Sequence, residues 1–211
     1  MSNTAEKILQ EKVLPGFENI QRYWDPMRKM VVAKVLPGEV YVTKHHELIT
    51  TLLGSCIAVC MRDKHNAIGG MNHFKLPAPP GSTSEKDASK DTNYGIYAME
   101  LLINGILKNG GDRKFLQCKI FGGGNVVQSI SSNIGEKNIS FVQDFMRQER
   151  IPVLHQSIGG TAGQQVYFHP ITGNDFAVTQ GQKSFDEIKK AETEYLSRVN
   201  NEMDDDGIEF F

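Results

Sequence analysis

The chain has 211 residues, 39% of them apolar, and carries 23 Lys and Arg against 25 Asp and Glu. This length predicts one domain with extensions at its ends, and the near-neutral charge argues against nucleic acid or anionic membranes as partners. The longest nearly apolar stretch, residues 49–61, is shorter than the roughly 20 residues that a membrane-spanning helix needs. Because the N-terminus lacks the pattern of a signal peptide, we expect the three cysteines to be reduced thiols in the cytoplasm.

The first part of the chain is expected to form an arm followed by a β-hairpin, because short apolar runs alternate there with turn-forming residues. In chain order, the expected elements are a polar arm over 1–35 with a short helix at 6–14, a strand at 40–42, a strand at 52–61, a turn at 62–66, a returning strand at 67–76 and a surface loop at 77–91. The second half of 52–61 is continuously apolar, which is typical of a strand buried on both faces.

The second part of the chain alternates helices with strands. A helix that Asp91 or Thr92 can cap carries apolar residues at helical spacing and ends at Gly110-Gly111. Capping-box patterns that begin at Asn133 and at Ser184 open two further helices. The remaining apolar runs predict strands at 116–121, 151–158, 165–168 and 175–179.

This order of elements predicts an α+β fold, a layered α/β sandwich built on a mixed sheet. We expect three parts, namely an N-terminal arm over 1–35, a single domain over 36–183, and a C-terminal helix with an acidic tail over 184–211. We also hypothesise that Tyr23, Trp24 and Met27 of the arm dock onto a partner or onto the domain's own surface.

Cys56 and His73 form the candidate catalytic pair. Cys56 follows Gly54-Ser55 at the junction of a tight turn and an apolar strand, and His73 follows Gly69-Gly70 on the returning strand. If the hairpin closes with a four-residue loop at 63–66, Cys56 lies directly opposite His73, with Cβ atoms about 5 Å apart. A loop of three or five residues would place the two side chains on opposite faces. An imidazole beside a thiol withdraws its proton, stabilises the thiolate and later protonates a leaving amine.

The supporting groups for this pair can also be named. Thr50 is the nearest upstream residue that could fix the imidazole tautomer, and the backbone N–H of Cys56 could bind a developing oxyanion. From the residues alone, Cys56 could equally be a packing residue, as Cys60 and Cys118 are expected to be, and His73 could be structural.

Two other kinds of site are weakly indicated. His45-His46 together with Cys56 could suggest a metal, but adjacent histidines point to opposite faces of a strand. The glycine runs at 122–124 and 159–163 could suggest phosphate binding, but they lack the Lys-Ser/Thr pair of a P-loop and the spaced glycines of a dinucleotide site. We therefore expect neither a metal nor a cofactor.

A set of segments, in a fixed order over about residues 38–180, carries a specific combination of motifs: Leu53–Cys60, Gly69–Pro77, Tyr94–Gly105, Lys119–Asn125, Ile134–Asn138 and Gly159–Pro170. Together these segments resemble the chemoreceptor glutamine deamidase (CheD) family of bacterial chemotaxis. The resemblance implies that Cys56 is the nucleophile, His73 the catalytic histidine and Thr50 the third site residue. The surrounding substrate and oxyanion region is expected to comprise Gly54, Ser55, Gly70 and Asn72.

The function implied by this resemblance is hydrolysis of glutamine side chains on the cytoplasmic helical bundle of methyl-accepting chemotaxis receptors, giving glutamate and ammonia. It also implies a fold similar to certain Cys–His toxin deamidases and binding of a chemotaxis phosphatase as a possible second partner. Two departures from the family pattern stand out: Lys75, where an apolar residue is expected, and Gln164, where a basic residue is common. The alternatives are a non-catalytic adaptor that binds receptors or a phosphatase, and a related thiol enzyme such as a transglutaminase or cysteine protease.

Overall fold

The computed structural model describes residues 12–76, 85–126 and 134–180, together with Leu9, Asp186, Lys190 and Glu194, and for residues 85–93 it describes the backbone alone. Most of the helix predicted at 6–14, the residue Asn133, and most of the C-terminal helix and tail predicted over 184–211 lie outside the described residues. No helix within the described ranges is long and apolar enough to cross a membrane.

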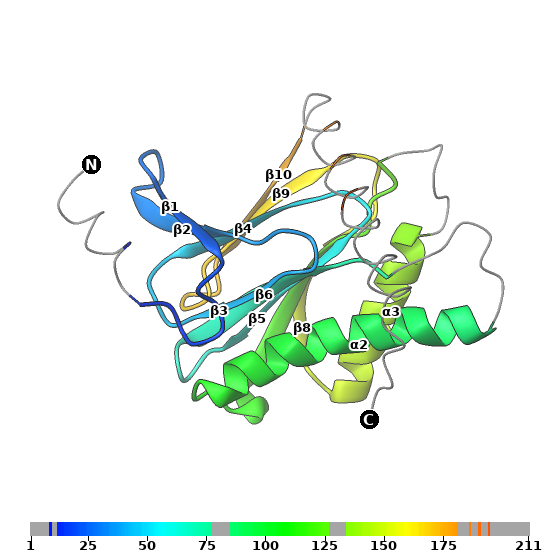
Figure 1. Ribbon diagram of the computed structural model, residues 1–211, viewed down its shortest axis with the longest axis horizontal. Coiled ribbons are helices and arrows are strands. Elements are labelled where there is room, and N and C mark those ends of the chain that lie inside the picture. The colour runs from blue at the N-terminus through cyan, green and yellow to red at the C-terminus, as the bar shows by residue number, and fades with distance from the viewer. Residues whose placement is uncertain are drawn as a thin grey trace.

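Two five-stranded mixed sheets form the body of the protein (Figure 1). Sheet A contains, in spatial order, β1 (Gln21–Asp25), β2 (Met30–Lys34), β4 (Leu48–Leu53), β9 (Gln164–Phe168) and β10 (Asp175–Thr179). Sheet B contains, in spatial order, β3 (Val40–Thr43), β6 (Ile68–Phe74), β5 (Ile57–Asp63), β7 (Leu116–Gly122) and β8 (Val153–Ile158). The pairs β2–β4 and β7–β8 are parallel, and the other neighbouring strands are antiparallel.

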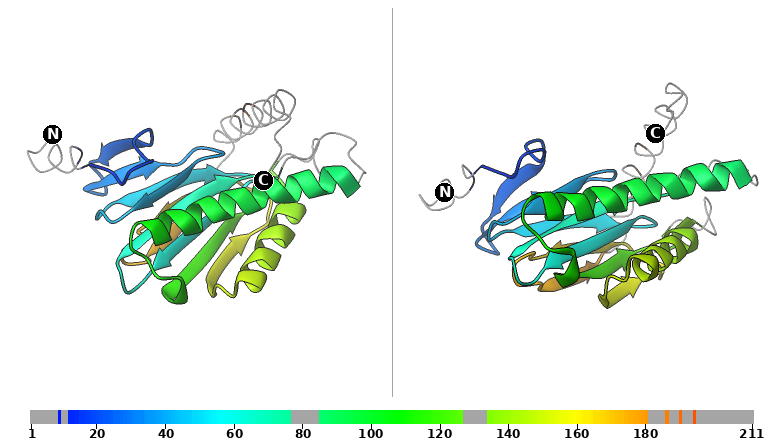
Figure 2. Two further views of the ribbon diagram at one scale, coloured as in Figure 1. Left: turned by 60° about the horizontal axis from the view of Figure 1, so that its bottom comes forward. Right: turned by 90° about the horizontal axis from the view of Figure 1, so that it is seen from below.

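The helices α2 (Glu85–Lys108) and α3 (Ile134–Glu149) lie together on one side of sheet B, away from sheet A (Figure 2). A short 3₁₀ turn, η1 (Arg113–Phe115), connects α2 to β7. The order of layers is therefore sheet A, sheet B and helices. The predicted α+β class is confirmed, with two mixed sheets in place of the single one expected.

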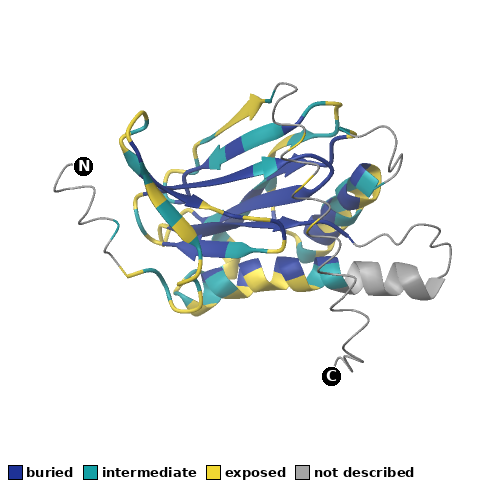
Figure 3. Ribbon diagram, turned by 45° about the horizontal axis from the view of Figure 1, so that its top comes forward, coloured by how far each residue is buried: buried dark blue, intermediate teal, exposed yellow. Residues whose placement is uncertain are grey.

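Each face of sheet B packs into a separate hydrophobic core, and buried residues concentrate in its strands (Figure 3). The alternation of side chains along β5 separates the two cores, because successive residues of a strand point to opposite faces. Ile57, Val59 and Met61 pack against the helices. Cys56, Ala58 and Cys60 belong to the core between the sheets. A residue of β5 or β6 can therefore reach either the helical layer or the inter-sheet space.

Most of the expected strands and helices are present, with shifted boundaries. The expected strand at 52–61 is divided, because Gly54-Ser55-Cys56 forms a bend between β4 in one sheet and β5 in the other. Helix α2 begins at Glu85 rather than at Asp91 or Thr92, so it includes part of the segment predicted as a loop. Its apolar face is confirmed, since Met99, Ile103 and Ile106 are buried against sheet B.

The expectation that residues 1–35 form an arm is wrong for 21–34, which form the β1–β2 hairpin of sheet A. Val31, Val32 and Ala33 are at most 1% exposed, because β2 pairs in parallel with β4 and is covered on both faces. The sequence analysis did not predict this hairpin because β1 has a polar composition. Such a composition is expected of β1, since it is an edge strand. The docking role proposed for Tyr23, Trp24 and Met27 stays a prediction.

The β5–β6 hairpin closes with a four-residue loop, as expected, but the loop is Lys64–Ala67 rather than 63–66. Asp63 still belongs to β5, and its carboxylate accepts the backbone N–H groups of His65 and Asn66. Ala67 adopts a positive φ of 50°, a turn conformation that an alanine does not signal in a sequence. The register consequently differs by two residues from the prediction, and His73 pairs with Ala58 instead of Cys56.

Candidate active site

The bend at 54–56 places Cys56 at the edge of the core between the two sheets. Two backbone hydrogen bonds fasten it to the glycine-rich segment after β7: the N–H of Gly123 donates to the carbonyl of Cys56, and that of Gly124 donates to the carbonyl of Gly54, both at 2.8 Å. The Cys56 side chain is buried in the cluster between the sheets. The thiol is therefore held by a rigid backbone frame.

Gly122 is required for this frame. It has a φ of +100°, and a Cβ atom at this position would lie 2.1 Å from the carbonyl oxygen of Cys56. Neither the backbone conformation nor the space admits another residue. The glycine run at 122–124, which the sequence analysis considered for phosphate binding, instead permits close approach to the backbone of Cys56.

A second glycine-rich segment, 159–163, packs against the first. The N–H of Gly159 donates to the carbonyl of Gly122, and the N–H of Asn125 donates to the carbonyl of Gly160. The bend at 54–56 and both glycine runs thus meet at one end of the sandwich, around Cys56. The sequence analysis considered the two runs for phosphate binding and did not assign them to the site, although their place among the family motifs was a signal that could have done so.

His73 lies on the same face of sheet B as Cys56, although the two residues are not directly paired. A shift of the hairpin register by two residues preserves the face of every side chain, because the side-chain period of a strand is two. His73 pairs with Ala58, and Ala58 belongs with Cys56 to the core between the sheets. The residue His73 is 2% exposed. Its imidazole points toward sheet A, where it contacts Thr51.

Thr51 fixes the tautomer of His73. The Thr51 Oγ1 lies 2.7 Å from Nδ1 of His73 and 2.7 Å from the carbonyl oxygen of Val35. A hydroxyl has one hydrogen, and only the hydroxyl can donate to the Val35 carbonyl, so Nδ1–H must donate to Oγ1. The other ring nitrogen, Nε2, is buried and carries the lone pair of the neutral imidazole.

Thr50, the threonine chosen from the sequence, is placed elsewhere. Its hydroxyl donates to the carbonyl of Val166 at 2.8 Å and accepts from the Gln165 amide at 2.6 Å. Adjacent residues of β4 point to opposite faces, so only one of the two threonines can face sheet B. The residue that contacts His73 is Thr51, and alternation from the buried Ile49 and Leu53 was the signal that could have identified it.

Asn138 of α3 connects the two strands of the β5–β6 hairpin, at its end next to Cys56. Its side-chain Oδ1 accepts the N–H of Leu76 at 2.9 Å, and its Nδ2 donates to the carbonyl of Ser55 at 2.8 Å. In the continuing register Ser55 and Leu76 would pair directly, so the carboxamide of Asn138 takes the place of a ladder hydrogen bond. This buried side chain was quoted in a motif but was not recognised as part of the site.

Gly70 and Asn72 do not line the region around Cys56, contrary to expectation. They lie on the face of β6 that packs against α2. A Cβ on Gly70 would meet Leu102 of α2, and Asn72 donates through Nδ2 to the carbonyl of Ala98. Their position follows from alternation with His73, so they attach the helix to the sheet. Gly54 and Ser55, by contrast, adjoin Cys56 in the bend.

The other two thiols are poor nucleophiles. Burial raises the pKa of the Cys60 thiol well above its usual value, and burial raises the pKa of the Cys118 thiol to about 12. The three cysteines form no disulfide. Cys60 and Cys118 are core residues, as the sequence analysis expected.

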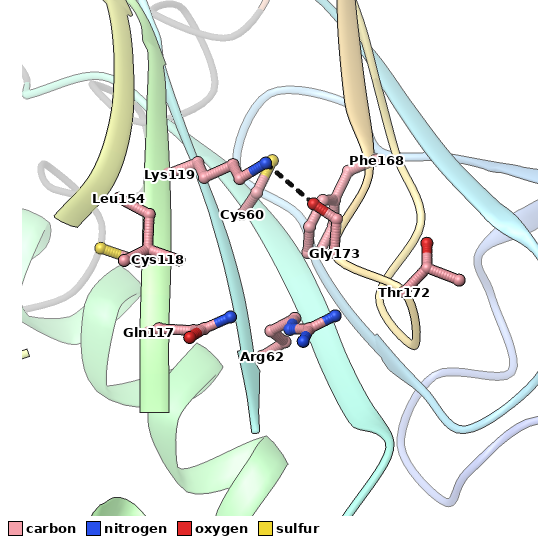
Figure 4. Close-up of a pocket in the computed structure, with 9 residues that line it drawn as sticks. All are labelled: Cys60, Arg62, Gln117, Cys118, Lys119, Leu154, Phe168, Thr172 and Gly173. Atoms are coloured by element: carbon pink, nitrogen blue, oxygen red, sulfur yellow. Dashed lines mark hydrogen bonds between the residues drawn. The ribbon is translucent and has the colours of Figure 1, made fainter. Parts of the chain in front are cut away.

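A cavity of about 180 Å³ lies between sheet B and the β9–β10 hairpin (Figure 4). Lys119 crosses it and donates from Nζ to the carbonyl of Gly173 at 2.8 Å, and it also pairs with Asp175. Arg62 closes another side, with one guanidinium N–H donated to the carbonyl of Ile171. The residues that line this cavity do not include Cys56, His73 or Thr51, so it is distinct from the candidate site.

The histidines considered for a metal site are remote from Cys56 along β4. His45 and His46 precede this strand, whereas Cys56 follows it. His46 contacts His169, with 3.4 Å between Nδ1 and Nε2, and His45 Nε2 lies 2.9 Å from the carbonyl of Lys12. Within the described ranges, no three His, Cys, Asp or Glu side chains are grouped so that they could hold a metal ion.

Comparison with known proteins gives a consistent result over nearly the whole chain. Residues 76–178 match a family model described as CheD chemotactic sensory transduction. Proteins named probable chemoreceptor glutamine deamidase CheD are 37% identical over 201 residues in Halorhodospira halophila and 39% identical over 202 residues in Saccharophagus degradans. Each of these alignments covers 94% of this chain and 93% of the relative. A relative of the same name in Methylobacillus flagellatus is 42% identical, over 84% of this chain and 88% of its own length.

Proposed function

Because the chain belongs to the CheD family of chemoreceptor glutamine deamidases, we propose that it hydrolyses glutamine side chains of chemotaxis receptors to glutamate and ammonia, with Cys56 as the nucleophile. The substrate is the cytoplasmic helical bundle of a methyl-accepting receptor, and the enzyme acts in the cytoplasm. A chemotaxis phosphatase is a second candidate partner. The reaction needs no metal or cofactor, because thiolate and imidazole supply both the nucleophile and the proton transfers.

In the first half of the reaction, the Cys56 thiolate forms a bond to the carboxamide carbon of the glutamine, and the carbonyl oxygen becomes an oxyanion. The oxyanion collapses and the C–N bond breaks, while His73 donates its Nε2 proton to the leaving nitrogen, which departs as ammonia. The glutamyl group is left as a thioester on Cys56. The backbone around Gly54 and Ser55 is the proposed oxyanion region.

In the second half, neutral His73 accepts a proton at Nε2 from a water molecule that attacks the thioester carbon. The C–S bond then breaks, the side chain leaves as a carboxylic acid that loses its proton to solvent and becomes glutamate, and the thiolate–imidazolium pair is restored. The observation that carries this assignment is the hydrogen bond between Thr51 and Nδ1 of His73. It directs the basic nitrogen away from Thr51 and holds the ring on the face that carries Cys56.

The proposed activity is tested with the purified full-length protein and a purified cytoplasmic fragment of a methyl-accepting receptor. Ammonia release, and conversion of specific glutamines to glutamate in peptide mass spectra, are the expected results. Binding of the fragment without conversion would contradict the enzyme and favour the adaptor. Neither binding nor conversion would contradict the choice of receptors as substrate.

The two threonines of β4 are predicted to differ in their effect on the rate. Thr51→Val removes the acceptor for Nδ1–H, so we expect kcat to fall by about 10–100-fold, with KM little changed. Thr50→Val leaves the imidazole contact intact and should change kcat by less than about 3-fold. The measurement is steady-state deamidation by both variants, with Thr51→Ser as the variant that restores activity. A larger loss in Thr50→Val than in Thr51→Val would contradict the assignment.

A further inference from the structure

The cavity between sheet B and the β9–β10 hairpin takes no part in the proposed reaction, and its lining is chemically specific. It lies beside Arg62, near the C-terminal end of β5. Figure 4 shows the nitrogen-bearing ends of Arg62, Gln117 and Lys119 directed from the strands of sheet B toward the β9–β10 turn. Leu154 and Phe168 supply apolar walls. The cavity therefore combines hydrogen-bond donors with apolar contacts.

The guanidinium of Arg62 is bound to the protein through one of its terminal nitrogens. Its Nη1 donates to the carbonyl of Ile171 at 2.8 Å. Nε and Nη2 form a separate edge, which is the fork that binds both oxygens of one carboxylate in arginine–carboxylate pairs. Within the described ranges, the buried Nε has no hydrogen-bond partner. A buried N–H without an acceptor is destabilising, so an acceptor is expected at this edge.

The turn between β9 and β10 holds this guanidinium in place. A Cβ on Gly173 would lie 2.5 Å from Nη1, 2.8 Å from Cζ and 3.0 Å from Nε of Arg62, so the backbone of this glycine packs against the guanidinium. The turn is closed by two hydrogen bonds of 2.8 Å, from the N–H of Gly173 to the carbonyl of His169 and from the N–H of His169 to the carbonyl of Asn174. The fork is therefore preorganised, which lowers the cost of ordering it when a ligand binds.

The carboxylates at this end of the sandwich have partners of their own. Asp175 pairs with Lys119, and Glu47 pairs with Arg22. Asp63 is the last residue of β5 and points away from the space between the sheets, where its carboxylate accepts N–H groups of the hairpin loop. In the part of the chain that the structure describes, no carboxylate forms an ion pair with the guanidinium at the cavity. A ligand with a single negative charge would therefore balance the charge of the cavity.

We propose that this cavity binds a small organic acid, with its carboxylate on the Nε–Nη2 edge of Arg62 and its hydrocarbon part against Phe168 and Leu154. One carboxylate supplies the acceptor for Nε and balances the guanidinium charge, whereas a phosphate dianion would leave a negative charge in excess. A cavity of about 150 Å³ binds benzene, so the volume of about 180 Å³ suits a ligand of roughly seven heavy atoms. The site is separate from Cys56 and does not depend on the proposed function.

The test uses pentanoate, a monocarboxylate of matching size, and the Nε–H nuclear magnetic resonance signal of Arg62 in the isotopically labelled full-length protein. At constant ionic strength, we expect millimolar pentanoate to shift this signal to saturation, and equal concentrations of pentanamide or inorganic phosphate to leave it nearly unchanged. No shift with pentanoate, or an equal shift with the uncharged pentanamide, would overturn the proposal. A larger shift with phosphate would overturn the choice of an organic acid.

Substitutions of Arg62 test whether its fork receives the carboxylate, with affinity measured from the backbone amide signal of Gly173. Arg62→Met should weaken pentanoate binding by about 10–100-fold, because it removes two charge-assisted hydrogen bonds. Arg62→Lys keeps the charge but loses the fork, so it should weaken binding by a smaller factor, and it serves if Arg62→Met does not fold. Arg147→Met removes an exposed arginine of α3 and should bind pentanoate as the natural chain does. Unchanged affinity in either Arg62 variant, shown to be folded by its thermal transition, would overturn the proposal.

Discussion

His73→Ala is expected to reduce the rate of receptor deamidation by about 10³-fold or more, because it removes the group that protonates ammonia and activates water. The described groups that hold the imidazole, the Thr51 hydroxyl and the Val35 carbonyl, cannot exchange a proton with the substrate at neutral pH. The measurement is site-resolved conversion of glutamine in a receptor fragment at saturating substrate.

A surface histidine provides the matched control for this variant. His155 of β8 is exposed, and His155→Ala should retain nearly all of the activity. Circular dichroism and a cooperative thermal transition must show that His73→Ala is folded. A folded His73→Ala protein that keeps more than about a tenth of the natural rate would contradict the proposed role, since general acid–base catalysis contributes far more than this.

Gly122→Ala is expected to have the largest combined effect on stability and activity. The new methyl group would overlap the carbonyl oxygen of Cys56, which lies 2.1 Å from its position, and φ would remain at +100°. We expect the free energy of unfolding to fall by about 3 kcal/mol, as a left-handed conformation alone costs about 1–2 kcal/mol for a residue other than glycine. Displacement of the Cys56 backbone should also reduce the rate by about 100-fold in the protein that remains folded.

Gly16→Ala isolates the backbone component of this effect. Gly16 has a similar φ of +91°, but a Cβ there would have no heavy atom within 4 Å. We therefore expect a loss of about 1 kcal/mol and unchanged deamidation, measured by chemical denaturation and by rate. Equal losses of stability in the two variants would contradict the prediction, because they would show that the clash with the Cys56 carbonyl adds nothing to the destabilisation by Gly122→Ala.

The hairpin that carries the site could be predicted from the sequence, but its register could not. The apolar run before residue 62 and the glycines before His73 indicate two adjacent strands, and both are present. The register depends on a single alanine in a left-handed conformation, Ala67, and residue type gives little warning of that choice. The common face of Cys56 and His73 was nevertheless foreseen, since a two-residue error leaves it unchanged.

The contacts between sequence-distant segments were beyond the sequence analysis. Asn138 lies 83 positions from Ser55 in the sequence, and no local pattern indicates that its side-chain amide would bridge the β5–β6 hairpin. The role of Gly122 is likewise set by the carbonyl of Cys56, in the bend that precedes the neighbouring strand β5. Alternation along β6, by contrast, could have separated Gly70 and Asn72 from His73 once the inward face was known.

The measurement that tests the central claim most directly compares the natural protein with Cys56→Ser and Cys60→Ser on the same receptor fragment. Both cysteines are buried on the same face of the β5 segment, four residues apart, so the two substitutions disturb the same core by the same change of atom. We expect Cys56→Ser to abolish conversion of glutamine to glutamate while binding and folding persist, and Cys60→Ser to retain activity. Deamidation at the natural rate by a folded Cys56→Ser protein would contradict the thiol mechanism and, with it, the assignment of the site.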